Sequence, residues 1–352
     1  MTRPVLAGAT LTVALALGVT ASARTLETFK HSETRTLDVG TAPHVVIEAI
    51  SGDVSYRGQD GATAQVEVAI DVRAKTEAEA ADIRAHLKLY IESENGFLDV
   101  RMEDTREFYE WLRDEYGRDY AATVSFHVTG PRGAEGTLSS VSGWVEATDL
   151  AGPVEATSVS GDVTVTGVQK TVRASSTSGN VDVRRAGEAV FAESVSGDVG
   201  VADCGGDLDL ESTSGSVKAR GAGGTVTAQT VSGDIEVMEA SLDVDAESIS
   251  GMIWVETQDG EVRASTTSGD ITISSPTDGD IDVQSVSGSV RLSIEPKAFG
   301  DVSLSSPSGE IDTAVPMQVS HKTRRRLEGR LGDGTAVLRV STNSGDITIS
   351  AL

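Results

Sequence analysis

Apolar and polar residues alternate with a period of two in many short segments of the chain from residue 134 onward. The segments 163–165 and 172–174, for example, read Val-Thr-Val and Val-Arg-Ala. This period matches a β-strand with one buried and one exposed face, whereas an α-helix repeats every 3.6 residues. The pattern therefore predicts an all-β structure made of short strands.

The strands recur in a fixed repeat that is marked by a Ser-Gly dipeptide. Its serine lies at positions 142, 160, 178, 196, 214, 232, 250 and 268, which are seven consecutive intervals of 18 residues. Each unit holds two alternating segments with glycines between them. Such units predict a single-stranded parallel β-solenoid with about 18 residues and two short strands per coil. Equivalent residues, such as Val163, Val181 and Val199, would then lie side by side, about 4.8 Å apart.

Two features of the repeat lead to further expectations. The residue after each Ser-Gly is acidic in every other unit, in the series Asp162, Asn180, Asp198, Ser216, Asp234, Met252, Asp270 and Ser289. We attribute this alternation to repulsion between carboxylates on neighbouring coils, and a 36-residue coil would produce it as well. We also expect the turn glycines to adopt left-handed backbone conformations, which glycine enters at little steric cost.

The rest of the chain is organised around this array. Residues 1–23 combine Arg3, an apolar run and an Ala-Ser-Ala cleavage pattern, and we interpret them as a signal peptide. An N-terminal linker over 24–35 and an opening β coil over 36–61 follow. Residues 62–133 lack the repeat and are expected to form an α/β insertion or cap. The repeat array occupies 134–352, with a basic loop at 314–334 and a last coil that ends at Leu352.

The insertion holds the most distinctive cluster of side chains. A capping box at Thr76 and Glu79 predicts the start of a helix, and Glu94-Asn95-Gly96 predicts the turn of a hairpin. Aromatic side chains gather further along, and they are candidate ligand-binding residues for a sugar or a peptide: Phe108, Tyr109, Trp111, Tyr116 and Tyr120. The alternative is a lid whose aromatic residues cover the end of the solenoid.

Charge and composition exclude several classes of protein. The net charge of −25 argues against a nucleic-acid partner, because nucleic-acid binding requires a basic surface. A single cysteine excludes a disulfide scaffold and any multi-thiolate metal site. The five histidines lack metal-binding spacings, so no metal and no cofactor are expected. The apolar run near the N-terminus is short for a bilayer span, so we expect no transmembrane segment in the mature chain.

The repeats resemble those of a known family. Residues 49–54, Ala-Ile-Ser-Gly-Asp-Val, and the later Val-Ser-Gly-Asp-Val and Thr-Ser-Gly-Asn-Val coils are similar to the bacterial putative-adhesin family, the domain of unknown function 4097 (DUF4097). Residues 332–349, which end in Asn-Ser-Gly-Asp-Ile-Thr-Ile, resemble the usual C-terminal coil of that family. The resemblance covers most of 36–352. It implies a scaffold without established catalytic residues, and it links some relatives to envelope-stress responses.

Three functions follow as hypotheses. The first is an exported, non-enzymatic scaffold in the periplasm or at the cell surface, which binds envelope polysaccharide or a surface protein as an adhesin does. The second is an envelope-stress sensor that captures cationic peptides through its negative charge. The third is a polysaccharide-acting β-helix enzyme. We disfavour the enzyme because the outward arginines, among them Arg173, Arg184, Arg220 and Arg263, share no column with a catalytic acid. End-to-end self-association through the last coil is a further expectation.

Overall fold

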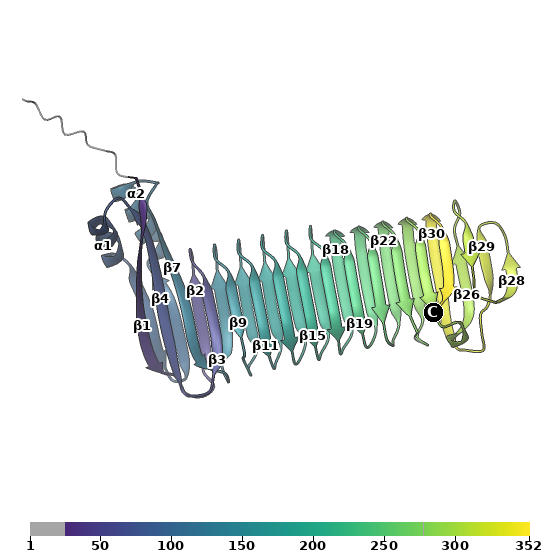
Figure 1. The fold of residues 1–352 in the computed structure, drawn as a ribbon, viewed down its shortest axis with the longest axis horizontal. Coiled ribbons are helices and arrows are strands. Elements are labelled where there is room, and N and C mark those ends of the chain that lie inside the picture. Colours follow the sequence, from purple (N-terminus) through teal and green to yellow (C-terminus); the bar gives the residue numbers. More distant parts are fainter. Residues whose placement is uncertain (1–24, 277) are drawn as a thin grey trace, which may run out of the picture.

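The computed structural model describes residues 25–276 and 278–352. Within these residues the chain forms two long β-sheets that lie face to face along the molecule (Figure 1). Sheet A contains 15 strands of the described chain, and sheet B contains 16. The prediction of a parallel β-solenoid is confirmed. The predicted signal peptide, residues 1–23, lies outside the described residues.

In the array the chain alternates between the sheets, so that each coil gives one strand to each sheet. The sheet A strands are β9 (Val145–Thr148), β11 (Val163–Val168), β13 (Val181–Ala186), β15 (Val199–Cys204), β17 (Val217–Ala222), β19 (Ile235–Ala240), β21 (Ile253–Thr257), β23 (Ile271–Ser275) and β25 (Val290–Ile294). The sheet B strands are β8 (Glu135–Ser140), β10 (Val154–Ser158), β12 (Val172–Ser176), β14 (Val190–Ser194), β16 (Leu208–Ser212), β18 (Val226–Ser232), β20 (Val244–Ser250), β22 (Val262–Ser268) and β24 (Ile281–Ser287).

The register of the strands establishes an 18-residue coil. Val163 is the Cα partner of Val181, and Val181 is the partner of Val199, in parallel strands of sheet A. These three valines are at most 1% exposed, because they face sheet B across the core. The 36-residue alternative is therefore wrong. The core consists of stacked β-branched side chains, which suit a pleated surface.

A buried row of serine and threonine hydroxyls fixes the Ser-Gly edge. The hydroxyl of Ser176 donates to the carbonyl oxygen of Gly161 in the preceding coil and accepts from the N–H of Gly179 in its own turn, both at 2.9 Å. The same bridge recurs at Ser158, Ser194 and Ser212. It stabilises each turn and joins it to the previous one, and the two backbone groups would otherwise lack a partner inside the protein.

The aspartates after the Ser-Gly dipeptides have a structural role that the sequence did not reveal. Asp162 Oδ1 accepts from the N–H of Asn180 at 2.8 Å, and the side chain of Asn180 accepts from the N–H of Asp198 at 2.9 Å. Asn180 thus serves as an uncharged acceptor of the same kind. The carboxylates of Asp198, Asp234 and Asp270 accept from the next coil in the same way, so charge avoidance alone does not explain the series.

Left-handed backbone conformations occur at the opposite edge. One residue per coil has φ between 56° and 71°, at Asp149, Gly167, Arg185, Asp203, Gly221 and Glu239. Only two of these six positions hold glycine, although the conformation is costly for other residues. The Ser-Gly glycines of the array do not adopt it, so that expectation was wrong for them. Their glycine has a different cause, which is the close approach of the preceding coil.

Antiparallel strands and helices cover the N-terminal end of the array, and we refer to them as the cap. The first of these strands lies where a linker over 24–35 was expected, so that expectation was wrong. In sheet A, β1 (Glu27–Asp38), β4 (Thr63–Ala74) and β7 (Ala121–Pro131) pair antiparallel, and β7 joins β3 (Val54–Gln59) in parallel. In sheet B, the hairpin of β5 (Lys88–Glu94) and β6 (Phe97–Glu103) joins β2 (His44–Ala49). The opening coil, β2 and β3, is therefore covered on both sides and is not outermost.

Two helices lie at this end (Figure 1). Helix α1 (Glu77–Ala85) begins at Thr76, whose hydroxyl accepts from the N–H of Glu79 at 3.2 Å, as the capping box predicts. Helix α2 (Thr105–Tyr116) follows β6 and buries Phe108 and Leu112. Of the helices in the described residues, none is both long enough and apolar enough to cross a lipid bilayer.

The C-terminal end departs from a simple progression of coils. The short helix η1 (Pro296–Ala298) leads to β26 (Phe299–Ser305) and β27 (Ile311–Thr313), the last coil in space. The predicted basic loop contains a hairpin, β28 (Gln318–Lys322) and β29 (Arg326–Arg330). The chain then returns, and β30 (Ala336–Ser344) and β31 (Ile347–Ala351) insert between the two preceding coils. The final coil of the sequence is covered on both sides, so the expected uncapped end at Leu352 was wrong.

Candidate ligand-binding site

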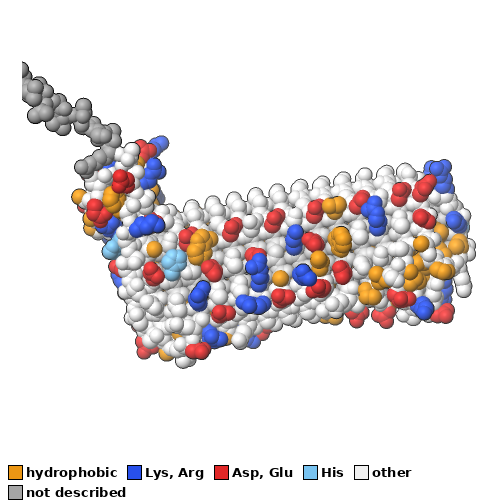
Figure 2. Space-filling view, in the orientation of Figure 1, with side chains coloured by type: hydrophobic (Ala, Val, Ile, Leu, Met, Phe, Trp, Pro, Cys, Tyr) orange, Lys and Arg blue, Asp and Glu red, His pale blue; other side chains and the backbone are white. Residues whose placement is uncertain are grey.

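The outer face of each sheet presents straight rows of side chains. Alternate residues of each strand point outward, and the parallel register places Asp182, Gly200 and Lys218 beside one another in sheet A. A second row holds Arg184, Ala202 and Arg220. Successive positions in a row are one strand spacing apart, about 4.8 Å. Figure 2 shows the sheet A face, where basic side chains gather near the middle of the array.

A hollow of about 320 Å³ lies among these basic side chains. We refer to it as the basic hollow. The residues that line it include Asp182, Arg184, Gly200, Ala202, Lys218, Arg220, Glu236 and Met238. Its floor is β15, where Gly200 and Ala202 are the smallest outward side chains of their rows. The walls are the longer side chains of β13 and β17. The hollow is thus a trough one coil wide with a cation-bearing strand on each side.

Each cation of the basic hollow has a carboxylate neighbour on the surface. Arg184 lies 2.6 Å from Asp182, Lys218 lies 3.3 Å from Glu236, and Arg220 lies 3.0 Å from Glu239. The three cationic side chains remain 59%, 63% and 62% exposed. The hydrogen bond that Arg220 donates to Glu239 raises the pKa of its guanidinium. Ion pairs that are this exposed are weak, so an incoming anion can compete for the cations.

Exposed apolar side chains adjoin the basic hollow on its C-terminal side. Met238 lines the hollow itself, while Met252 and Trp254 on the next coil are 57% and 54% exposed. Trp254 is the Cα partner of Glu236. Hydrophobic side chains are visible beside the basic group in Figure 2. Aromatic and thioether side chains at a surface supply apolar contact area for a ligand that also carries polar groups.

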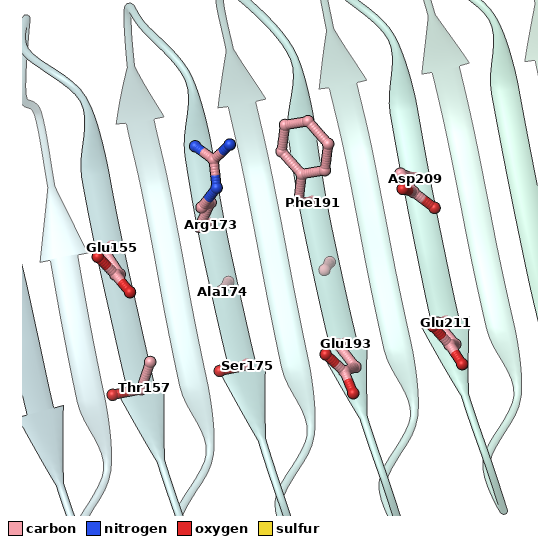
Figure 3. Close-up of a pocket in the computed structure, with 10 residues that line it drawn as sticks. Glu155, Thr157, Arg173, Ala174, Ser175, Phe191, Glu193, Asp209 and Glu211 are labelled. Carbon is pink, nitrogen blue, oxygen red and sulfur yellow. The ribbon is translucent and has the colours of Figure 1, made fainter.

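The opposite face carries a second hollow of a different chemistry (Figure 3). This acidic hollow, of about 280 Å³, lies on β10, β12, β14 and β16 of sheet B, and its charged lining residues are Glu155, Arg173, Glu193, Asp209 and Glu211. The Arg173 guanidinium lies 4.6 Å from the ring centroid of Phe191, a cation–π contact. Glu193 and Glu211 are Cα partners, so two carboxylates occupy neighbouring positions of one row.

The five aromatic residues that the sequence singled out lie together on α2 and just beyond it. Phe108 is buried, and the Tyr109 hydroxyl donates to the carbonyl oxygen of Ala122 at 3.1 Å. The Trp111 ring stacks on His86, with the centroids 3.8 Å apart. These contacts attach α2 to the rest of the cap.

The two remaining tyrosines make polar contacts with α1. Tyr116 donates to Asp82 at 2.6 Å, and Tyr120 donates to Glu79 at 3.1 Å. The hydrogen bond to Asp82 raises the pKa of Tyr116 to about 12. Tyr109 and Tyr120 also line a hollow of about 300 Å³, and ligand binding by the five aromatic residues stays a prediction.

The sequence did not identify the basic hollow. The sequence predicts that Arg184 and Arg220 point outward, without a column that they share with a catalytic acid. In the structure they share a row, 36 residues apart, with Ala202 between them. The signal that could have found the site is Gly200, the glycine that replaces a longer outward residue of the repeat. Among the described residues, no three His, Cys, Asp or Glu side chains are grouped to hold a metal ion.

Comparison with known proteins supports the family resemblance for the C-terminal part of the chain. Residues 243–350 match the family described as Toastrack DUF4097. The resemblance drawn from the Ser-Gly-Asp coils is thereby confirmed over that segment. No curated protein matches the sequence at a significant level.

Several solved structures are similar to this chain. One is a "putative adhesin" from Parabacteroides distasonis ATCC 8503, with 15% identity, a TM-score of 0.41 and coverage of 74% of this chain and 97% of that chain. A "putative lipid binding protein" from the same organism has 14% identity, a TM-score of 0.36 and coverage of 91% and 96%. A "putative adhesin" from Bacteroides fragilis NCTC 9343 has 14% identity, a TM-score of 0.28 and coverage of 92% and 97%.

Proposed function

We propose that the protein is an exported, non-enzymatic scaffold that binds components of the cell envelope or cell surface, as an adhesin does. The observation that carries this proposal is the geometry of the two outer faces. Each face presents rows of side chains in strict register over many coils, as for Asp182, Gly200 and Lys218. A long, flat and rigid surface of this kind is suited to an extended polymer or to the surface of another protein.

Binding to envelope material tests the proposal. The purified protein is mixed with a bacterial envelope fraction and with intact cells, and the bound fraction is measured by sedimentation. We expect saturable binding that excess unlabelled protein displaces. Fractionation of cells that produce the full chain tests export, and cytoplasmic retention would contradict it. A panel of polysaccharides, assayed for new reducing ends, tests the non-enzymatic part, because a hydrolase or lyase would release them.

The acidic hollow supports a second candidate function, the capture of cationic peptides by an envelope-stress sensor. Glu193 and Glu211 are neighbours in one row, and Asp209 and Phe191 line the same hollow. A cationic, partly apolar peptide would reduce the repulsion between the carboxylates and contact the phenyl ring. The overall charge of −25 would also steer such a peptide to the surface.

Titration with a lysine- and leucine-rich peptide at low and high salt tests this second function. We expect affinity to fall as the salt concentration rises and to fall further in a Glu193→Gln, Glu211→Gln double variant. The matched control is Glu247→Gln, a carboxylate of the same face outside the hollow. Affinity that does not respond to salt or to the double variant would exclude the sensor function.

A further inference from the structure

We propose that the basic hollow of sheet A binds a carboxylate-bearing sugar ring of an acidic polysaccharide. This inference rests on the proposed scaffold function and specifies its ligand class. It is carried by three observations on one face: a glycine that the fold does not require, two arginines on the strands to either side of it, and an exposed apolar surface beside the hollow.

Gly200 leaves an opening where the fold would accept a side chain. A Cβ atom at this position would meet only Asp182 Oδ2, at 4.0 Å, which is ordinary contact. At Gly197, three residues earlier, a Cβ would lie 2.1 Å from the carbonyl oxygen of Gly179, so that glycine is required. Glycine inside a strand weakens it and often marks a close approach by a ligand. In the row from Glu146 to Arg291, all of it within the described residues, Gly200 is the one glycine.

The cations around the opening are arranged to hold one anionic group. Arg184 and Arg220 lie on either side of Ala202, two strand spacings apart, which is about 10 Å. A ring that sits on Gly200 and Ala202 would present a carboxylate to either guanidinium, and Lys218 is within the same lining. Guanidinium groups bind carboxylates through paired N–H donors, which gives orientation as well as attraction.

The carboxylates of the hollow fit the hydroxyl groups of a sugar. Asp182 and Glu236 line the same space and are oxygen acceptors. Hydroxyl groups of a pyranose ring can donate to them while the ring carboxylate takes over part of the arginine contacts. The hollow of about 320 Å³ is at the lower end of the size range of small-ligand sites, about 300–1,000 Å³. That size suits one sugar ring of a longer chain.

The surface next to the hollow allows the polymer to continue. Met238 lines the hollow, and Trp254 lies two strand spacings beyond Lys218 along the row. The indole ring is 54% exposed and offers a flat apolar surface to the next sugar ring. A flat face with alternating ionic and apolar contacts is complementary to a chain in which carboxylates alternate with apolar ring faces.

The surroundings favour this ligand over other anionic partners. The whole chain carries a charge of −25, and carboxylates accompany each cation of the hollow. Densely charged polyanions such as nucleic acids, and anionic bilayers, require a broad basic surface. A polysaccharide with one carboxylate per ring needs only two or three cations to pair with that carboxylate. Its hydroxyl groups can donate hydrogen bonds to the carboxylates of the hollow.

Titration calorimetry with tetragalacturonic acid at physiological salt tests the proposal on the full-length protein. We expect binding by the wild type and roughly tenfold weaker binding for Arg184→Gln and for Arg220→Gln, because each loses a charge-assisted hydrogen bond. Gly200→Thr should fill the hollow and abolish binding while thermal stability stays equal or rises, since threonine favours strands. The matched control is Arg263→Gln, an arginine of sheet B with 58% exposure and its own carboxylate partner.

Two comparison ligands complete the test. The methyl-esterified tetrasaccharide should bind more weakly because it lacks the charge, and inorganic phosphate should not compete at millimolar concentration if the ring is needed. Competition by phosphate, wild-type affinity in Gly200→Thr, or an equal loss in Arg263→Gln would overturn the site. Envelope binding measured on the same variants separates the two proposals. Envelope binding that survives in Gly200→Thr leaves the scaffold function intact and removes this site, whereas a wild type that binds no envelope removes the scaffold function.

Discussion

Gly161 stacks directly on Gly143 in the preceding coil, and a Cβ atom at Gly161 would lie 2.0 Å from the carbonyl oxygen of Gly143. The same relationship holds for Gly179 on Gly161, at 2.1 Å. Backbone atoms of one turn therefore occupy the space that any other residue would need in the next. This contact explains the invariance of glycine in the Ser-Gly repeat of this chain, and it sets how closely the coils approach along that edge.

Replacement of Gly161 by alanine should destabilise the array. The new methyl group has to displace the backbone of the neighbouring coil, and we expect a loss of about 1–3 kcal/mol in the free energy of unfolding. Urea titration followed by circular dichroism measures it. Gly200→Ala is the matched control, because its Cβ would meet only Asp182 at 4.0 Å. Equal stability of the two variants would contradict the close approach.

Removal of one buried hydroxyl should also destabilise the Ser-Gly edge. Ser194 donates to Gly179 O and accepts from Gly197 N, both at 2.9 Å. Ser194→Ala leaves both backbone groups without this partner, so we expect a cost of about 1–3 kcal/mol in urea unfolding.

Two further variants at this edge control for side-chain size and position. Ser194→Thr should keep most of the stability, because Thr230 makes the equivalent bond to Gly215 at 3.0 Å. Ser196→Ala, at the exposed serine of the same turn, should change the stability by no more than about 0.5 kcal/mol. A larger effect at Ser196 than at Ser194 would contradict the bridging role.

Much of this fold follows from the sequence because the repeat is so regular. The period of 18 and the alternation at Val163 and Val181 are sufficient to predict the strands, the buried face and the stacking. The order in which the coils stack is harder to predict, because it depends on pairing between segments that are distant in the sequence. The insertion of β30 and β31 before the coil of β26 and β27 leaves no trace in the local pattern, because each coil is compatible with any neighbour.

The candidate site was harder to predict for a related reason. Arg184 and Arg220 are separated by 36 residues, and only the confirmed 18-residue register shows that one coil lies between them. Gly200 interrupts an outward row of longer side chains, but it is one of 37 glycines in the chain. Its distinction is the open space around its Cα atom, which is a property of three dimensions. The aromatic residues of α2 were candidate ligand-binding residues because they are clustered in the sequence. In the structure they make contacts within the cap.

Lowering the pH should reduce the stability of the stack through protonation of Asp270. The N–H of Ser289 and the guanidinium of Arg291 both donate to this carboxylate, at 2.9 and 3.0 Å, and they hold its pKa below the usual value. A lowered folded-state pKa gives stability that is present above the unfolded-state pKa, about 3.9, and is lost as pH falls through the folded-state value. The effect is moderate because the side chain is 41% exposed.

The variant Asp270→Asn tests this dependence. Asparagine keeps an acceptor for Ser289, as Asn180 does for Asp198 at 2.9 Å, but it does not titrate. Urea unfolding between pH 6 and pH 2 should show a stability difference between wild type and variant that is present at pH 6 and shrinks below about pH 4. A difference that is constant across this range would contradict the assignment.

Loss of the Phe108 ring should affect the N-terminal cap alone. Its side chain is 5% exposed, and Phe108→Ala removes contacts that are worth about 3–5 kcal/mol in a protein core. Hydrogen exchange should accelerate in α2, while the amides of β13 and β15 keep their protection, because stability in a solenoid depends on neighbouring units. Glu110→Ala on the exposed side of α2 is the control. Faster exchange throughout the array would contradict a local role.

Both hollows and both edges of the stack depend on 18-residue coils in register. Spin labels at Thr164→Cys and Thr272→Cys, in a Cys204→Ala background, measure this directly by double electron–electron resonance. The two positions lie in one outward row, six coils apart, through Asp182, Gly200, Lys218, Glu236 and Trp254. The 18-residue coil predicts a backbone separation of about 29 Å, six strand spacings. A separation of about 14 Å, as 36-residue coils would give, would contradict the stack and every surface built on it.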